Sequence, residues 1–343
     1  MKIALALLLT CATLLAGCGG GGGSSGSSTS STSNSSSSGS GTQTSTSTAS
    51  EFTAPTLVNA SSPVTYGAKC DGTTDDSAAF QAAVNAGDVL VPAATCVINA
   101  SVNVTMSNRH IQCDQGAVLS QTNPDAGHMF NIYSPTNATL TGDSIVDCTF
   151  IGSNTVAPQY YTDARQQDIP VETQDYVSNF FLAGNTFKQF YGQSTFQTYG
   201  TTNGGSGDVI EYNTFQSCGY YGPVLDAHTN GYIGHNIITD CAIGVENDNT
   251  SQNTGGNILE YNTVTAVYGY GAPYMNDAAF ITGGIAAGVN YSGNIVRNNT
   301  VSGVSGTGAF EPVGQPTAIW ETPTGGSAAQ YSNNTCGTGC QTD

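Results

Sequence analysis

Tyr212-Asn-Thr-Phe215 is one copy of a short pattern that recurs through the second half of the chain. Each copy places an asparagine before β-branched or aromatic residues, and the five asparagines are Asn185, Asn213, Asn236, Asn262 and Asn299. Their successive spacings are 28, 23, 26 and 37 residues. Unequal spacings of this size are typical of a solenoid whose coils differ by loop insertions. We therefore expect one coil for each copy.

The residues around each asparagine predict strands rather than helices. Short apolar or β-branched pairs such as Ile237-Ile238 and Thr263-Val264 follow the asparagine, and helical periodicity is absent. An asparagine at a corner tolerates left-handed backbone angles, and its amide can bond the equivalent asparagine one coil away. The predicted fold class is all-β, a right-handed single-stranded parallel β-helix.

The first fifty residues predict export and anchoring. Lys2, an apolar run over residues 3–15 and the sequence Leu15-Ala-Gly-Cys18 resemble a bacterial lipoprotein signal. The resemblance implies a signal peptide over residues 1–17, a lipidated Cys18 and, with Gly19 next to it, the outer membrane or cell surface. Residues 18–52 are then a tether rich in Gly, Ser and Thr. Residues 53–343 form the β-helix domain.

The remaining cysteines predict disulfides. After Cys11 and Cys18, eight are left, and an even number in an exported chain favours disulfide bonds. Cys218 and Cys241 each follow a ladder asparagine by five residues, so they occupy the same position on neighbouring coils. Because adjacent strands lie about 4.8 Å apart, we expect this pair to be bonded. A zinc site would need histidines close to the thiolates, which the sequence does not provide.

The charge balance excludes one class of partner and restricts another. Six Lys and Arg residues oppose 24 Asp and Glu residues, giving a net charge of −18. Nucleic acid binding needs clusters of basic residues, so it is excluded. Acidic polysaccharides would be repelled unless a cation bridged them.

A segment near residue 70 resembles the opening of the pectate-lyase-like superfamily. The matching residues are Tyr66-Gly-Ala-Lys-Cys-Asp-Gly-Thr-Thr-Asp-Asp76, with Cys70 where the family has glycine. The resemblance implies a β-helix from about residue 64 to 335, with a short helix that covers its first coil. From the residues, Thr74, Asp75 or Asp76 can begin this helix and Gly87 can end it. We expect structural roles for Asp71, Asp75 and Asp76.

One group of acidic residues is the candidate catalytic site. When the coils are aligned on glycines such as Gly222 and Gly244, Asp226 and Asp248 coincide, with His228 and Glu246 two residues away. Alternate residues of a strand share a face, so these four side chains are expected to project together. Their expected spacings bracket the carboxylate separations of retaining and inverting glycosidases. Decoration of a solvated face is the alternative, and the direction of this face remains open.

Resemblances within the superfamily do not select one activity. The polygalacturonase motifs NTD, DD, GHG and RIK are absent, and no Arg or Lys lies near the acidic group, which disfavours a pectate lyase. Asp226-Ala-His228 resembles the Asp-Pro-His of mannuronan C5-epimerases, with Tyr221 upstream as acid or base.

Tyrosines crowd the loops around the acidic strand. Tyr199, Tyr221, Tyr270 and Tyr274 are expected to stack on sugar rings. His235, by contrast, shares a repeat position with Tyr212 and Tyr261, so a stack of these rings along the coils is expected.

The combined prediction is a surface-anchored protein that binds and cleaves an extracellular polysaccharide. Asp226, Asp248, Glu246 and His228 are the predicted catalytic residues, and no cofactor is required. One alternative is a lyase or uronan epimerase with Ca²⁺ held by Asp226, Glu246 and Asp248. Another is a non-catalytic adhesin or envelope scaffold. The glycan, the stereochemical outcome and the oligomeric state stay open.

Overall fold

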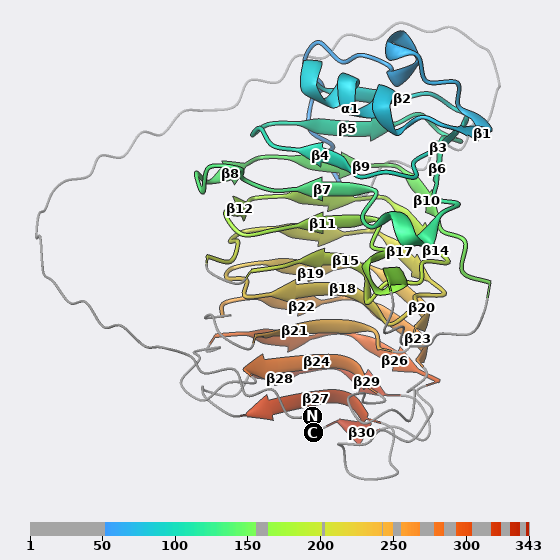
Figure 1. Ribbon diagram of the computed structural model, residues 1–343. Helices are drawn as coiled ribbons and strands as arrows, with labels where there is room; N and C mark the ends of the chain where they lie inside the picture. The colour runs from blue at the N-terminus through green and yellow to red at the C-terminus, as the bar shows by residue number, and fades with distance from the viewer. Residues whose placement is uncertain are drawn as a thin grey trace, which may run out of the picture. The chain divides into compact units, whose positions relative to one another are not determined.

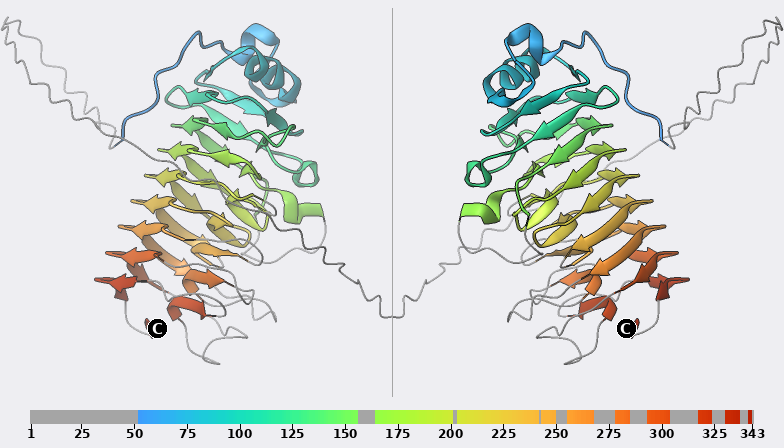
Figure 2. Two further views of the ribbon diagram at one scale, coloured as in Figure 1. Left: turned by 90° about the vertical axis from the view of Figure 1, so that its left-hand side faces the viewer. Right: turned by 90° about the vertical axis from the view of Figure 1, so that its right-hand side faces the viewer.

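The chain winds into a parallel β-helix in which each full coil contributes one strand to each of three sheets (Figures 1 and 2). The computed structural model describes residues 52–155, 164–200, 203–241, 243–249, 255–267, 278–284, 293–303, 317–323, 330–336 and 341–342. The predicted all-β parallel β-helix is confirmed. The predicted signal peptide, Cys18 and nearly all of the tether lie outside the described residues.

The three long sheets take their strands in turn along the chain. Sheet A contains β2 (Val89–Val91), β5 (His110–Cys113), β9 (Ser144–Val146), β13 (Phe181–Ala183), β16 (Val209–Glu211), β19 (Tyr232–Gly234), β22 (Ile258–Glu260), β25 (Ile295–Arg297) and β28 (Gln330–Ser332). Sheet B contains β1 (Asp71–Asp75), β3 (Thr95–Val97), β6 (Val118–Ser120), β10 (Thr149–Ile151), β14 (Thr186–Lys188), β17 (Thr214–Gln216), β20 (Ile237–Cys241), β23 (Thr263–Val267), β26 (Thr300–Ser302) and β29 (Thr335–Cys336). Sheet C contains β4 (Val102–Val104), β7 (Phe130–Ile132), β11 (Val171–Thr173), β15 (Ser194–Thr198), β18 (Tyr221–Asp226), β21 (Val245–Asn249), β24 (Ala278–Gly284), β27 (Thr317–Pro323) and β30 (Gln341–Thr342). A small pair, β8 (Leu140–Thr141) and β12 (Val177–Ser178), extends one corner, and 3₁₀ turns lie at Pro63–Tyr66, Pro124–Ala126 and Ala164–Gln167.

Helix α1 (Ser77–Ala86) lies at the N-terminal end of the stack (Figure 1). It buries Phe80, whose ring meets Phe130 of β7 at 6.4 Å. The amide of Gly87 bonds back to the carbonyl of Ala83 at the helix end, as predicted. Asp76 takes the N-cap position without a capping bond; its carboxylate accepts the Lys69 and Cys70 amides instead. The structural role expected for this aspartate is confirmed.

The asparagine ladder forms between sheets A and B. Asn236 shows the repeating contacts: its Oδ1 accepts from the amide and the side chain of Asn213, at 2.9 and 3.1 Å. Its own side chain donates to Oδ1 of Asn262 at 3.0 Å. The structure adds a sixth rung, Asn334, which accepts from Asn299. The ladder prediction is therefore confirmed.

The left-handed backbone belongs to the residue before each asparagine, not to the asparagine itself. Tyr212, His235, Tyr261 and Asn298 have φ between 54° and 57°. The rings at this position stack as predicted, with Tyr212 to His235 at 4.7 Å and His235 to Tyr261 at 5.0 Å. Phe52 extends the stack beyond Tyr212 at 6.2 Å.

A second buried ladder, which the sequence prediction did not include, begins the strands of sheet A. Its members each precede such a strand: Asp88, Asp143, Asp208, Asn257 and Asn294. The side chains of the last four accept backbone amides of the preceding coil, at 2.7 to 3.0 Å. Burial raises the pKa of the Asp143 carboxyl to about 7 and that of Asp208 well above its usual value. A protonated carboxyl can therefore serve where other coils use an amide.

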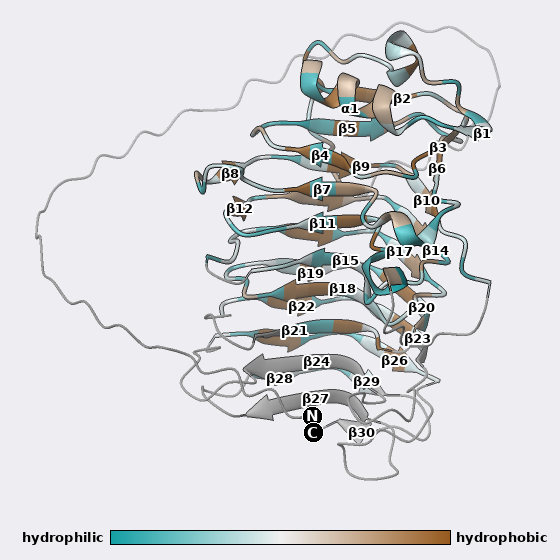
Figure 3. Ribbon diagram, in the orientation of Figure 1, coloured by the Kyte–Doolittle hydropathy of each residue, from teal (hydrophilic) through white to brown (hydrophobic). Residues whose placement is uncertain are grey.

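The core inside the coils is apolar, and brown apolar positions recur along the strands (Figure 3). Phe150, Phe187 and Phe215 stack across three coils at 4.7 and 5.1 Å. Disulfides join neighbouring coils at Cys70–Cys96, Cys113–Cys148 and Cys218–Cys241, the last being the predicted pair. Within the described residues, no helix has the length and apolarity needed to cross a membrane.

Candidate functional site

The outer face of sheet C carries two of the predicted carboxylates, Asp226 and Glu246, whereas the side chain of Asp248 lies outside the part of the chain that the structure describes. Asp226 is the last residue of β18, and its Cα lies in register with that of Asp248 on β21. Leu225 and Asn247, which alternate with these positions, are fully buried. Asp226 and Glu246 are partly exposed. The predicted alignment of the two coils is therefore present, and Asp226 and Glu246 face outward.

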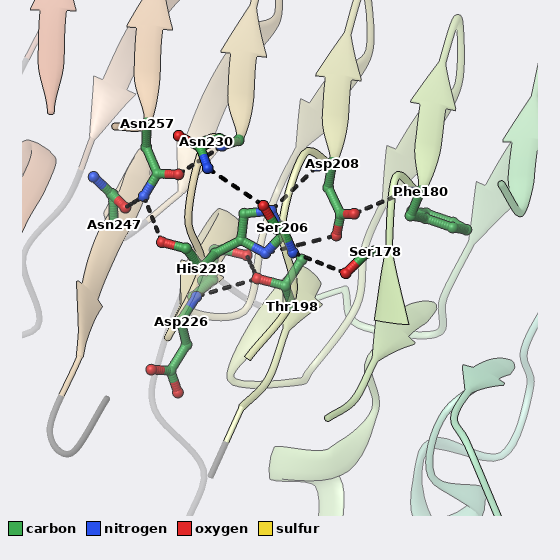
Figure 4. Close-up of polar contacts among 12 residues, drawn as sticks. Ser178, Phe180, Thr198, Ser206, Asp208, Asp226, His228, Asn230, Asn247 and Asn257 are labelled. Atoms are coloured by element: carbon green, nitrogen blue, oxygen red, sulfur yellow. Dashed lines mark hydrogen bonds and ion pairs between the residues drawn. The ribbon is translucent and has the colours of Figure 1, made fainter. Parts of the chain in front are cut away.

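His228 does not share this face, so the prediction that it projects with the carboxylates is wrong. Ala227 has φ of 56°, which turns the chain directly after Asp226 and ends the alternation of a strand. The imidazole is fully buried, and its Nε2 accepts the backbone amide of Asp208 at 3.2 Å. Figure 4 shows the Asp226 carboxylate pointing away from this imidazole.

The buried His228 contacts a buried aspartate, Asp208, and not a substrate. Its Nδ1 lies 3.8 Å from Oδ2 of Asp208, and both side chains are fully buried. Burial lowers the pKa of His228 to about 3 and raises that of Asp208 well above its usual value. Burial therefore favours the neutral form of both groups in this contact. The backbone carbonyl of His228 also accepts from the side-chain Nδ2 of Asn257, which donates to Oδ1 of Asn247 on β21 as well (Figure 4).

The tyrosines expected to bind sugar divide into exposed and buried. Tyr199, directly after β15, is 43% exposed, and its amide donates to the Thr173 carbonyl at 2.7 Å. Tyr221 is only 8% exposed, so the prediction that its ring stacks on a sugar is wrong. Tyr270 and Tyr274 lie outside the described residues. Of these four tyrosines, Tyr199 is the one whose ring the structure shows exposed to a ligand.

A polar hollow of about 570 Å³ lies beside Tyr199 on the same sheet. Its walls include Glu172 of β11, Gln197 of β15 and Gln174. Glu172 and Gln197 are register partners on neighbouring strands. Pockets of roughly 300 to 1,000 Å³ are the usual size for small ligands. The hollow can accordingly hold one or a few sugar residues.

Glu172 and His128 contact each other in the wall of this hollow. His128 Nε2 lies 3.2 Å from Glu172 Oε2, and Gln174 donates to the other carboxylate oxygen at 2.9 Å. The Glu172 side chain is only 7% exposed, so these partners fix its position. The sequence prediction missed this pair because the asparagine pattern, which sets the coil register, begins only at Asn185.

Asp168 is a further acidic residue near the hollow, and it is buried. Asp168 directly follows the turn at Ala164–Gln167, whose Gln167 lines the hollow. Its Oδ2 accepts the Tyr191 amide at 2.8 Å, and burial raises the pKa of the carboxyl to about 7. Because Asp168 is fully buried, it presents no surface to a ligand.

Metal-type ligands converge at one place in the part of the chain that the structure describes. Cys70, Asp76 and Cys96 bring three such atoms within 4.8 Å of one another. The two sulfurs are joined in a disulfide, and Asp76 accepts backbone amides. These residues brace the first coil and do not fit a metal ion.

No protein-family model matches this sequence, and no curated protein matches it either. Solved structures do share the fold. A family 28 exopolygalacturonase of Yersinia enterocolitica aligns with a TM-score of 0.56 and 14% identity, over 81% of this chain and 66% of that chain.

Two further solved structures align comparably. A 1,3-α-1,4-β-D-galactose-4-sulfate-3,6-anhydro-D-galactose-2-sulfate 4 galactohydrolase aligns with a TM-score of 0.55 and 14% identity, over 79% of this chain and 62% of that chain. The family GH82 iota-carrageenase from A. fortis aligns with a TM-score of 0.53 and 14% identity, over 79% and 60% of the two chains. At this identity the similarity shows the fold alone.

Proposed function

We propose that this protein binds an extracellular polysaccharide along the outer face of sheet C and cleaves it with Asp226 and Asp248. The observation that carries this proposal is the register of the two aspartates on neighbouring coils. Neighbouring strands lie about 4.8 Å apart and same-face residues of one strand about 7 Å apart. These spacings bracket the separations of roughly 5 Å and 6.5 to 9.5 Å that retaining and inverting glycosidases use.

The chemistry needs one protonated and one ionised carboxyl. Two carboxyls this close resist joint ionisation, so the pKa of one is raised, as a general acid requires. That group protonates the leaving oxygen, while the other acts as base or nucleophile. Glu246 lies two residues before Asp248 on β21 and adds negative charge that favours the protonated form of its neighbour.

The hollow and Tyr199 supply the binding part of the proposal. They lie on the strands that precede β18 in sheet C, so a glycan lying along the stack would meet the hollow, then Tyr199, then Asp226. The fold is also one that polysaccharide hydrolases use, including the exopolygalacturonase and the iota-carrageenase named above.

The test is a panel of neutral, basic and acidic polysaccharides incubated with the purified chain and assayed for new reducing ends. Asp226→Asn and Asp248→Asn are each expected to lower turnover by at least about 10²-fold, the low end for a positioned acid or base. Glu211→Gln, which removes a carboxylate from β16 of sheet A, is the matched control and is expected to keep full activity.

Other outcomes point to the competing functions. Products with an unsaturated sugar end, formed only without EDTA, would instead indicate a Ca²⁺-dependent lyase. Conversion of one uronic acid to its epimer without chain cleavage would indicate an epimerase. Binding without any chemical change would indicate an adhesin or scaffold, and full activity in both aspartate variants would refute the assigned residues.

We also propose that the protein is exported and held at the cell surface by lipid on Cys18. The support is the sequence around that cysteine and the parallel β-helix fold, which solved polysaccharide hydrolases share. Metabolic labelling with a radioactive fatty acid is expected to mark the wild type but not Cys18→Ser. Equal labelling of both would place the lipid on another residue, and labelling of neither would refute the anchor.

A further inference from the structure

We propose that the hollow beside Tyr199 binds ammonium groups, so that the polysaccharide is one built from amino sugars with free amines. The inference rests on the proposed function, because it names the substrate class of the same face. It starts from the walls of the hollow and from the charges around one exposed ring.

The hollow is acidic in the part of the chain that the structure describes. Glu172 and Asp175 line it, and none of its described lining residues is Lys or Arg. The other polar walls are amides such as Gln193 and Gln197, which suit sugar hydroxyls. A cleft lined by one sign of charge concentrates ligands of the opposite sign.

Tyr199 places an aromatic face among three carboxylates. The backbone amide of Asp226 donates to Oγ1 of Thr198 at 3.2 Å. Because Tyr199 directly follows Thr198, Asp226 lies near Tyr199. On the other side, Glu172 pairs in register with Gln197, two residues before Tyr199. The pKa of the Tyr199 hydroxyl is raised, mainly by burial and then by the negative charges of Asp226, Glu172 and Asp175.

This combination fits an ammonium better than the competing ligands. An ammonium gains from the ring face of Tyr199 and from the carboxylates around it. A uronic acid would meet like charges, and a neutral sugar would leave the charges unused. His128 offsets part of the negative charge when its imidazole is protonated, yet it is already held by Glu172. Asp175, whose carboxylate accepts the Asn203 amide, and Asp226 add further negative charge near the ring.

The test compares three oligosaccharides of equal length by calorimetry on the full-length chain, at a mildly acidic pH that keeps amines protonated. The probes are an oligomer of glucosamine, its N-acetylated form and an oligomer of galacturonic acid. The glucosamine oligomer is expected to bind at least about tenfold more tightly than the N-acetylated one, with the acidic oligomer weakest. This preference should shrink as salt is added.

Variants locate the site. Tyr199→Ala is expected to weaken glucosamine binding about tenfold, whereas Tyr199→Phe keeps the ring and is expected to stay near wild type. Asp175→Asn is expected to reduce the preference for the amine over its N-acetylated form by about fivefold. Glu211→Gln on sheet A is the charge-matched control and is expected to change neither value. Thermal midpoints confirm that each variant is folded.

Several results would overturn the inference. These are equal affinity for the amine and its N-acetylated form, tighter binding of the acidic oligomer, no binding of any probe, or an unchanged preference in the variants. Ca²⁺ binding that the same variants abolish would make the carboxylates a metal site. Cleavage of a neutral glycan that depends on Asp226 would keep the proposed function and overturn this inference, whereas amine-selective binding without cleavage would do the reverse.

Discussion

Replacing Asn236 by alanine tests the ladder at a rung whose contacts are fully described. The side chain is 1% exposed. Its Oδ1 accepts the Asn213 amide, and its Nδ2 donates to the carbonyls of Ile210 and Gly234 and to the Asn262 side chain. Alanine leaves the Asn213 amide without that acceptor in a buried site.

The expected loss follows from these contacts. An orphaned buried donor costs about 1 to 3 kcal/mol, and each lost hydrogen bond about 0.5 to 1.5 kcal/mol. Oδ1 of Asn262 keeps one partner, the Asn236 backbone amide, which limits the damage. We therefore expect Asn236→Ala to lower the free energy of unfolding by about 3 kcal/mol.

Chemical denaturation monitored by circular dichroism measures this loss. Gln216→Ala, at an exposed site on β17, is the matched control and is expected to stay within about 0.5 kcal/mol of wild type. The double variant with Asn213→Ala should lose less than the sum of the two single variants, because both share one set of bonds. An unchanged unfolding midpoint in Asn236→Ala, or full additivity in the double variant, would refute the reasoning.

Three further predictions concern stability. Replacing both Cys218 and Cys241 by serine should lower the free energy of unfolding by about 2 to 4 kcal/mol, and non-reduced peptide maps of the wild type should recover the two linked; free thiols in oxidised protein would contradict this. Burial raises the pKa of Asp168 from 3.8 to about 7, so the folded state holds this proton more tightly than the unfolded state does. The contribution of this carboxyl to stability should therefore fall as pH rises from about 4 to 7. Asp168→Asn should remove that dependence, and identical profiles of stability against pH in the variant and the wild type would contradict it. Asn257→Ala, which removes a buried acceptor for the Gly231 amide, should cost about 2 to 3 kcal/mol in equilibrium unfolding, and a loss below about 0.5 kcal/mol would argue against the second ladder.

The sequence was most informative where one residue type is required by the backbone. An asparagine that bonds its own copy on the next coil must recur at one position, so Asn213 and Asn236 were visible as a repeat. The position of Cys218 and Cys241 followed from the same register. The fold class and one disulfide could be predicted on that basis.

The second ladder was hidden because its chemistry is shared by two residue types. Asp208 and Asn257 serve the same purpose, since a buried carboxyl with a raised pKa resembles an amide. A search for one recurring letter does not detect such a position. The useful signal would have been any Asp or Asn directly before the strands of sheet A.

The site was only partly predictable because side-chain direction depends on single backbone angles. Asp226 and Glu246 could be placed by strand alternation, but the left-handed turn at Ala227 sent His228 into the core. The contact of His128 with Glu172 depends on coil lengths in a region without the asparagine pattern. Neither fact follows from local sequence.

Turnover of single and double aspartate variants tests the central claim most directly. On a polysaccharide that the wild type cleaves, Asp226→Asn and Asp248→Asn should each lose at least about 10²-fold in kcat, and the double variant should be little worse than the weaker single one, because paired carboxyls act as a unit. Turnover within about twofold of wild type in either single variant, with the fold intact, would contradict the claim that these two register partners perform the cleavage.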